Sequence, residues 1–191
     1  GPCANRDPGH LDSPSFRGVR HENAPTWLTS VMGKSGLFSD YLIKMAQVIT
    51  WWYRGPRGTF TYWPDGPLEP PAHLDTPLWN RGVVVQNEVM FHRGDPVGDP
   101  QDRVIDGLKH RSMIEYRADG DDWAITTDGE VVRTYRAEQM RLLVHWSSEV
   151  FMDFDELKKS LDHTDDLTHE RVIGALLADM RARGVAVAEP S

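Results

Sequence analysis

Apolar and polar residues alternate in short runs along the first two thirds of the chain, a pattern typical of half-buried β-strands. The clearest runs are Leu42–Tyr53, Thr59–Trp63 and Val83–Phe91, and all three are rich in branched and aromatic residues. The last of them opens with a block of valines, which predicts a buried strand. Shorter strands are predicted at Phe16–Arg20, Trp27–Met32, Arg111–Arg117, Trp123–Thr127 and Glu130–Tyr135.

Glycine, proline and aspartate separate these runs. Pro64-Asp65-Gly66 predicts a turn after the run at Thr59–Trp63. Asp128-Gly129 predicts a tight hairpin between the last two strands. The proline-rich stretch Pro67–Pro77 and the stretch Gly94–Pro100 are predicted to be loops. Short strands at such close spacing favour a sandwich, a jelly roll or a barrel.

The pattern changes after Tyr135. Met140–Phe151 is ambiguous between strand and helix, and Phe154–Leu161 predicts a short helix. Thr168 is a suitable N-cap for a final helix. The apolar residues of that helix recur on one face, at Val172, Ile173, Leu176, Leu177 and Met180. We therefore expect a series of short strands followed by a helical C-terminal part.

Length, charge and cysteine content narrow the function classes. At 191 residues the chain fits one domain with a real core. Its net charge of −8 argues against nucleic acid or an anionic membrane as the main partner, so a small molecule is expected instead. No apolar run approaches the roughly 20 residues that span a bilayer, and no secretory leader opens the chain. Because Cys3 is the single cysteine, an internal disulfide is excluded and a cytoplasmic protein is expected. Gly1-Pro2 resembles a protease scar with no Met before it, so we expect natural N-terminal residues to be missing.

With one cysteine, any metal must be held by histidine and carboxylate, and one His-x-Asp pair carries this hypothesis. His10 and Asp12 are two residues apart, so a strand would direct both side chains toward one ion. His92 follows Asp12 by 80 residues, at the end of the predicted strand Val83–Phe91. Two histidines and one carboxylate on one side of a metal leave three positions open, which is the geometry of non-haem iron sites.

Around these residues the sequence resembles the iron(II)/2-oxoglutarate-dependent dioxygenases, especially the phytanoyl-hydroxylase and taurine-dioxygenase-like branches. Their pattern is a His-x-Asp, a long middle segment, a strand ending in the distal His, and then an Arg. Here the corresponding residues are His10, Asp12, His92 and Arg103, the last of them 11 residues after His92. The resemblance covers roughly residues 9–118 and implies that the first three residues ligate Fe(II).

The resemblance also implies that 2-oxoglutarate is the cosubstrate, with its distal carboxylate bound by an arginine. A guanidinium matches a carboxylate through two parallel hydrogen bonds. Arg103 has the spacing of the family, whereas Arg111 opens a predicted strand and precedes Ser112, as an Arg-x-Ser-like anchor would. The sequence does not separate these two arginines.

The fold that the resemblance implies is mostly β, a double-stranded β-helix (jelly roll, cupin-like) with C-terminal helices. Residues 1–135 would form the jelly-roll catalytic core, and residues 136–191 a largely helical extension packed on it. The implied activity is hydroxylation, or a related desaturation or cyclisation, of a small molecule such as an amino acid or a natural-product intermediate, through a ferryl-oxo species.

A second ligand set has similar sequence surroundings. His73-Leu74-Asp75 is followed by a stretch that echoes the one after Asp12, and His145 would then be the third ligand. This set places its pair in the proline-rich loop, and no Arg follows His145 until Arg171. A third match, His163-Thr164-Asp165, is interpreted as part of an acidic helical linker and not as a ligand pair.

Two other functions stay open from the sequence. A cupin-like metalloenzyme that does not use 2-oxoglutarate would keep the His and Asp ligands without needing Arg103 or Arg111. A non-catalytic jelly-roll binding module would need neither the metal nor the arginines. Metal affinity and its dependence on 2-oxoglutarate separate these functions.

Overall fold

The computed structural model describes residues 7–99 and 105–185. The chain forms two compact units, each made of two segments of sequence. The strand unit comprises Gly1–Leu11 and Gln47–Ser147, and the helical unit comprises Asp12–Ala46 and Ser148–Ser191. The boundary expected after residue 135 is not one of these divisions and stays a prediction.

The longest strand, β2 (Leu42–Tyr53), is at the centre of a four-stranded sheet. Its second half pairs antiparallel with β5 (Leu78–Val85), and its first residues pair with β1 (Ser15–Phe16). β10 (Leu142–Val150) is its neighbour on the other side. The branched and aromatic residues of β2 favour this extended conformation, and alternate positions of its second half are buried.

A second antiparallel sheet has the order β4-β3-β6. Its central strand β3 (Phe60–Trp63) pairs with β4 (Ala72–Leu74) on one side and with β6 (Phe91–Gly94) on the other. β4 lies inside the stretch expected to be a proline-rich loop. Its three residues have strand pairing because they lie opposite β3, a contact that local composition does not show.

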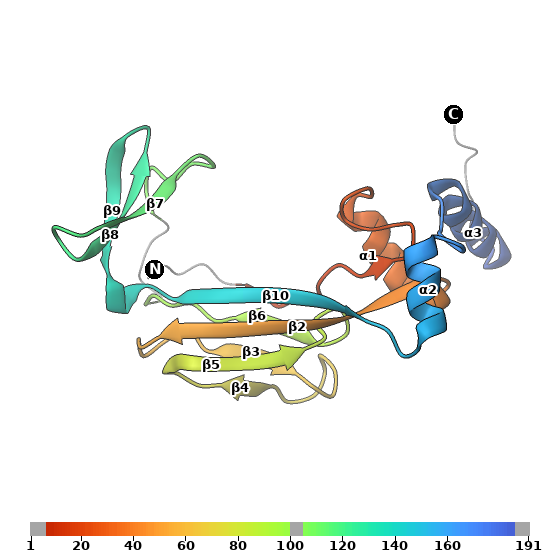
Figure 1. The fold of residues 1–191 in the computed structure, drawn as a ribbon, viewed down its shortest axis with the longest axis horizontal. Coiled ribbons are helices and arrows are strands. Elements are labelled where there is room, and N and C mark those ends of the chain that lie inside the picture. Colours follow the sequence, from red (N-terminus) through yellow and green to blue (C-terminus); the bar gives the residue numbers. More distant parts are fainter. Residues whose placement is uncertain (1–6, 100–104, 186–191) are drawn as a thin grey trace. The chain divides into compact units, whose positions relative to one another are not determined.

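These two sheets enclose the core of the strand unit. The ring of Trp51 in β2 lies 5.3 Å from the ring of Phe60 in β3, centroid to centroid. Figure 1 shows β3, β4 and β6 beside β2 and β5. The buried residues of this core are Ile49, Trp51, Tyr53, Phe60 and Leu78.

The third sheet is a meander of β7 (Met113–Arg117), β8 (Asp122–Thr127) and β9 (Glu130–Arg136). The expected hairpin between β8 and β9 is confirmed: Asp128 and Gly129 both have positive φ angles, 56° and 84°. Two consecutive residues of this kind form the turn that matches the twist of a hairpin. After β9 the chain passes through the short 3₁₀ helix η2 (Ala137–Gln139) into β10.

The helical unit contains α1 (Thr26–Ser35), the 3₁₀ helix η1 (Ser39–Tyr41), α2 (Phe154–Asp162) and α3 (His169–Ala182). The side chain of Thr168 accepts a hydrogen bond from Arg171 N, so the predicted N-cap of the last helix is confirmed. A buried cluster joins the two ends of the chain. Its members are Phe16, Val19, Ala24, Leu28, Met32, Phe38, Leu167 and Val172.

The strand prediction at Trp27–Met32 is wrong, because these residues lie in α1. Branched and aromatic residues favour a strand here, but Leu28 and Met32 are four positions apart and both are buried, which is helical spacing. The prediction of a buried strand at Val83–Phe91 is half right in its extent, and it is wrong about burial at Val84, which is 72% exposed. β5 ends at Val85, a turn follows in which Val89 and Met90 donate to Gln86 O, and β6 begins at Phe91.

The chain is therefore a mixed fold, with mostly antiparallel strands in three small sheets and helices toward the C-terminus. At this level most of the expected strands and the C-terminal helices are confirmed, although Trp27–Met32 is helical and only Phe16 of the strand expected at Phe16–Arg20 lies in β1. Within residues 7–99 and 105–185 the sheets are open, with no closed or curled sheet, so the double-stranded β-helix stays a proposal. Over the same residues, the helices are too short or too polar to cross a lipid bilayer.

Candidate metal centre

His10 and His92 lie directly opposite each other in an isolated antiparallel bridge. The backbone N–H of His10 donates to His92 O over 2.9 Å, and His92 N–H donates to His10 O over 3.0 Å. Residues paired in this way project their side chains to the same side of the ladder. The two imidazole rings accordingly lie 4.6 Å apart, centroid to centroid.

Residues of the second sheet pack against His92. His92 pairs with Tyr62 across β6 and β3, and its ring lies 5.8 Å from the ring of Phe60. Because Phe60 also packs on Trp51, His92 lies on the inner face of this sheet, with only 6% of its surface exposed. The sequence predicted His92 at the end of a strand that also held Val83–Val85. The structure instead gives it a separate strand, whose partner is β3.

Gly9 and Asp7, which precede His10 in the chain, determine how closely His10 lies to β6. Gly9 has a φ of +95°, and a Cβ at this position would lie 2.5 Å from an edge carbon of the Phe91 ring. Glycine is required here both by the backbone angle and by the close contact. The Asp7 carboxylate accepts hydrogen bonds from Gly9 N at 2.9 Å and from His10 Nδ1 at 3.2 Å. Burial alone raises the pKa of Asp7, but the bonds from Gly9 and His10 outweigh burial, so this pKa lies below its ordinary value.

The hydrogen bonds at the two Nδ1 atoms determine which ring nitrogens could ligate a metal. His92 Nδ1 lies 3.0 Å from Met90 O, and a carbonyl oxygen only accepts, so Nδ1 carries the hydrogen. The same argument applies to His10 Nδ1 and the Asp7 carboxylate. In the neutral form of each ring, Nε2 is then the nitrogen with the lone pair. Donation from the outer nitrogen to an oxygen is the usual support of a metal-bound histidine.

Asp12 completes the group, two residues after His10. One ligand atom from each of His10, Asp12 and His92 lies within 4.8 Å of the others. The three residues differ in burial: His10 is exposed, Asp12 is half-buried and His92 is buried. Two imidazole nitrogens and one carboxylate oxygen at this separation could hold a metal ion. The donor set fits Fe(II), and it equally fits other first-row divalent metals.

The two arginines expected to bind 2-oxoglutarate differ in what the structure describes. Arg103 lies outside the described residues. Arg111 precedes β7 and donates from Nε and Nη2 to the two carboxylate oxygens of Asp128, the second of these bonds measuring 2.7 Å. This hydrogen bonding raises the pKa of Arg111 and lowers that of Asp128. Arg111 therefore already holds one carboxylate in the way that an anchor would hold 2-oxoglutarate.

The alternative ligand set is not brought together within the described residues, where His10, Asp12 and His92 are the one group of this kind found. His73 lies in β4, and its Nδ1 is 3.0 Å from the hydroxyl of Thr61. His145 lies in β10, where it is exposed. His163 forms the C-cap of α2 and contacts Asp166, so it lies at a helix end as its acidic surroundings indicated.

The hydroxyl of Thr61 also links His73 to a partly buried row of polar residues that sequence reasoning missed. Asp95 accepts hydrogen bonds from the Thr59 and Thr61 hydroxyls and from Arg93 Nε. Burial alone raises the pKa of Asp95, but these hydrogen bonds and the Arg93 charge outweigh burial, and the pKa lies below its ordinary value. The alternating pattern of Thr59–Trp63, with threonines at every second position, is the one signal that could have indicated a polar face.

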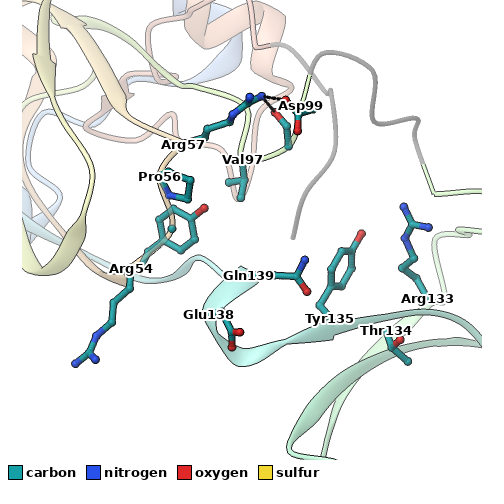
Figure 2. Close-up of a pocket in the computed structure, with 13 residues that line it drawn as sticks. Arg54, Pro56, Arg57, Val97, Asp99, Arg133, Thr134, Tyr135, Glu138 and Gln139 are labelled. Atoms are coloured by element: carbon teal, nitrogen blue, oxygen red, sulfur yellow. Dashed lines mark hydrogen bonds and ion pairs between the residues drawn. The ribbon is translucent and has the colours of Figure 1, made fainter.

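A cavity of about 720 Å³ lies in the strand unit, next to the start of the β2–β3 connection. Figure 2 shows the ion pair of Arg57 with Asp99 on one side of it, and Tyr135 and Gln139 on the other. Burial raises the pKa of the Tyr53 hydroxyl in its wall. His10, Asp12 and His92 are not among the described residues that line this cavity.

His10, Asp12 and His92 thus have ligand atoms close together, and outer hydrogen bonds orient the two histidine rings. No protein-family model, curated protein or solved structure matches the chain.

Proposed function

We propose that the chain is a non-haem iron(II)/2-oxoglutarate-dependent oxygenase that hydroxylates a small molecule. The observation that carries the proposal is the group formed by His10, Asp12 and His92, whose ligand atoms lie within 4.8 Å of one another. One carboxylate and two imidazoles are the donors of the facial triad, which leaves open positions for a cosubstrate and oxygen. Iron held by these residues would supply, with 2-oxoglutarate and oxygen, the oxidising power to hydroxylate an unactivated C–H bond.

The residues around the triad support a stable ligand geometry. The backbone bridge fixes the spacing of the two histidines, and Met90 O fixes the ring of His92. Asp7 does the same for His10. Because outer hydrogen bonds of this kind orient the ring and raise its basicity, these residues would act as positioning groups rather than as ligands.

The proposed double-stranded β-helix is supported by the packing of the strand unit. Trp51 and Phe60 bring two antiparallel sheets face to face, and His92 lies on an inner face. A jelly roll is built from two such sheets, with its site between them. The described residues form open sheets, and the double-stranded β-helix is our proposal beyond that arrangement.

Either Arg103 or Arg111 would bind the distal carboxylate of 2-oxoglutarate. For Arg111 this requires an exchange, because its guanidinium is bonded to both oxygens of Asp128. This pairing is also the observation that favours a second candidate, a metalloenzyme that uses the same three ligands without 2-oxoglutarate. In that case the pair of Arg111 and Asp128 would simply stabilise the β7–β8 region.

The decisive experiment is an anaerobic titration of metal-free protein with Fe(II) and then 2-oxoglutarate, followed by absorption spectroscopy. We expect the weak visible charge-transfer band of chelated 2-oxoglutarate only after both Fe(II) and 2-oxoglutarate have been added. His92→Ala should remove the band. His145→Ala is the matched control, because it removes the histidine of the alternative ligand set, and it should leave the band intact.

Each other outcome has a definite meaning. Metal binding without a band would favour the metalloenzyme that does not use 2-oxoglutarate. Absence of metal binding in the wild-type protein would favour a non-catalytic binding module. A band that survives His92→Ala but is lost in His145→Ala would show that the wrong triad is proposed.

A further inference from the structure

β10 is an exposed strand with apolar side chains on both faces. Among the described residues, its one neighbour in a sheet is β2, which leaves its other edge without a strand partner (Figure 1). Leu142, Val144 and Trp146 project to one face and are 60%, 52% and 64% exposed, while Leu143 on the other face is 41% exposed. A long edge strand of this kind is normally shortened, charged or covered, because its unpaired N–H and C=O groups recruit another strand.

We propose that this edge pairs with the same edge of a second copy of the chain, antiparallel and around a two-fold axis at Ser147. An interface around a two-fold axis uses the same surface on both copies, so each contact between two residues occurs twice and the surface must be complementary to itself. With Ser147 opposite Ser147 of the second copy, His145 faces Glu149 and Val144 faces Val150. Beyond the strand end, Leu143 faces Phe151, so apolar residues meet apolar residues outside the central polar positions.

Neighbouring registers lack this match. If one strand slides by one residue along the other, Glu149 lies opposite Val144 or Trp146 of the second copy. Both arrangements would remove a carboxylate from water against an apolar side chain. An axis at Trp146 places Glu149 opposite Leu143. An axis at Ser148 instead places His145 opposite Phe151. The arrangement centred on Ser147 is the one of these that places the two titratable side chains of the strand opposite each other, where Glu149 also forms an ion pair with Arg20 of its own chain.

This palindromic match is the reason for choosing a second copy over an unrelated partner. A strand that recognised a different protein would have no need for the same polarity on both sides of its centre. Here the sequence from Leu142 to Met152 runs apolar, polar and apolar again about Ser147, with Trp146 against Ser148 as the one uneven pair. Backbone pairing would satisfy the open edge, and the apolar pairs would add burial.

A cysteine at the symmetry axis tests the register. Directly opposed residues of an antiparallel pair have Cα atoms about 4.5–5.5 Å apart, within the range that a disulfide spans. In a Cys3→Ser background, Ser147→Cys should therefore form a covalent dimer under mild oxidation at low protein concentration. Ser147 is exposed, and its hydroxyl lies 3.5 Å from His145 Nε2, so the substitution removes one weak contact. Circular dichroism checks that the fold is kept. Ser148→Cys is the matched control, and its cross-linking should be at least about tenfold slower.

A second measurement follows the non-covalent dimer by sedimentation velocity over a range of concentrations. His145→Glu places Glu opposite Glu149 twice per dimer and should weaken the dimer about tenfold. His145→Gln, which keeps the size without the charge, should weaken it much less. A wild-type chain that stays monomeric at high concentration, with no cross-link in Ser147→Cys, overturns the proposal. Faster cross-linking of the Ser148→Cys variant than of the Ser147→Cys variant overturns the stated register.

Discussion

At the residue scale, the exposed ligand of the candidate metal centre depends on a glycine next to it. Gly9 combines a φ of +95° with a position where a Cβ would meet the Phe91 ring at 2.5 Å. An alanine there forces a shift of either the Phe91 ring or the backbone next to His10, and both adjoin the bridge between His10 and His92. We therefore expect Gly9→Ala to weaken Fe(II) or Co(II) binding at least about tenfold, measured by anaerobic titration.

Gly66→Ala is the matched control for this prediction. Gly66 has a similarly positive φ of +106°, but nothing lies within 4 Å of its added Cβ. It therefore bears the conformational strain without the clash, and it should bind metal like the wild type. Equal metal affinity in all three proteins would mean that the bridge between His10 and His92 does not set the ligand geometry.

Asp7 provides a second test at this scale. Its carboxylate accepts from His10 Nδ1 at 3.2 Å, so Asp7→Asn removes a charge but keeps the size of the group. Loss of such an outer partner typically reduces metal affinity about 10- to 100-fold, and we expect a decrease in that range. The control is Glu22→Gln, which alters another His–carboxylate pair, with His21, on the surface. A decrease of the same size in both variants would point to net charge rather than to positioning.

At the scale of elements, we expect substitutions of two glycines by alanine to change the free energy of unfolding in opposite directions. Gly129 has a φ of +84° in the β8–β9 turn, with open space around it, so Gly129→Ala should cost about 1–2 kcal/mol through backbone strain alone. Gly174 lies inside α3, also with open space around it, so Gly174→Ala should stabilise that helix by about 0.5–1 kcal/mol. Urea unfolding followed by circular dichroism measures both changes. Stabilisation by Gly129→Ala would contradict the two-residue turn.

Elements whose signals are local could be predicted from the sequence, and those that depend on distant partners could not. β2, the Asp128-Gly129 turn and the Thr168 cap all lie where their own residues indicate. α1 was missed because Leu28 and Met32 are buried against Phe16 and Val172, and this packing outweighs the strand propensity of Trp27–Met32. The break between β5 and β6 also involves a distant residue, since Asn87 N donates to Gln47 Oε1.

The candidate metal site divides in the same way. The pair of His10 and Asp12 could be read from its two-residue spacing. Its closeness to His92 is a non-local contact, for which the sequence offered only a resemblance. The roles of Gly9 and Asp7 could not be predicted, because both depend on the backbone path toward Phe91.

At the scale of the whole molecule, one ion pair ties the beginning of the helical unit to its end. Arg17 donates to both oxygens of Asp165, at 2.8 and 2.9 Å, and to Asp40 O. The Arg17 side chain is 7% exposed. Its hydrogen bonds lower the pKa of Asp165 below the ordinary value of 3.8. This stabilisation is therefore fully present above that ordinary value and is lost as the pH falls through the lowered pKa.

We expect Asp165→Asn to reduce the free energy of unfolding by about 2 kcal/mol at pH 7, because it leaves Arg17 buried without its counter-charge. The difference from the wild type should shrink as the pH falls below the ordinary pKa, since the carboxyl then becomes neutral in both states. Urea unfolding at a series of pH values measures this. Asp155→Asn, an exposed change in the first turn of α2, is the control. A constant difference at every pH would contradict a charge effect.

The backbone bridge between His10 and His92 has one further consequence. A metal held by these residues would cross-link two points of the chain roughly 80 residues apart, as a disulfide closes a loop in proteins that have cysteine pairs. The unfolded chain does not hold the ligands together, so metal affinity and folding would be thermodynamically linked. Metal should then raise the melting temperature of the protein, and a chelator should lower it. A protein with a single cysteine would in this way have a reversible cross-link, and the stability that it adds would depend on the concentration of free metal.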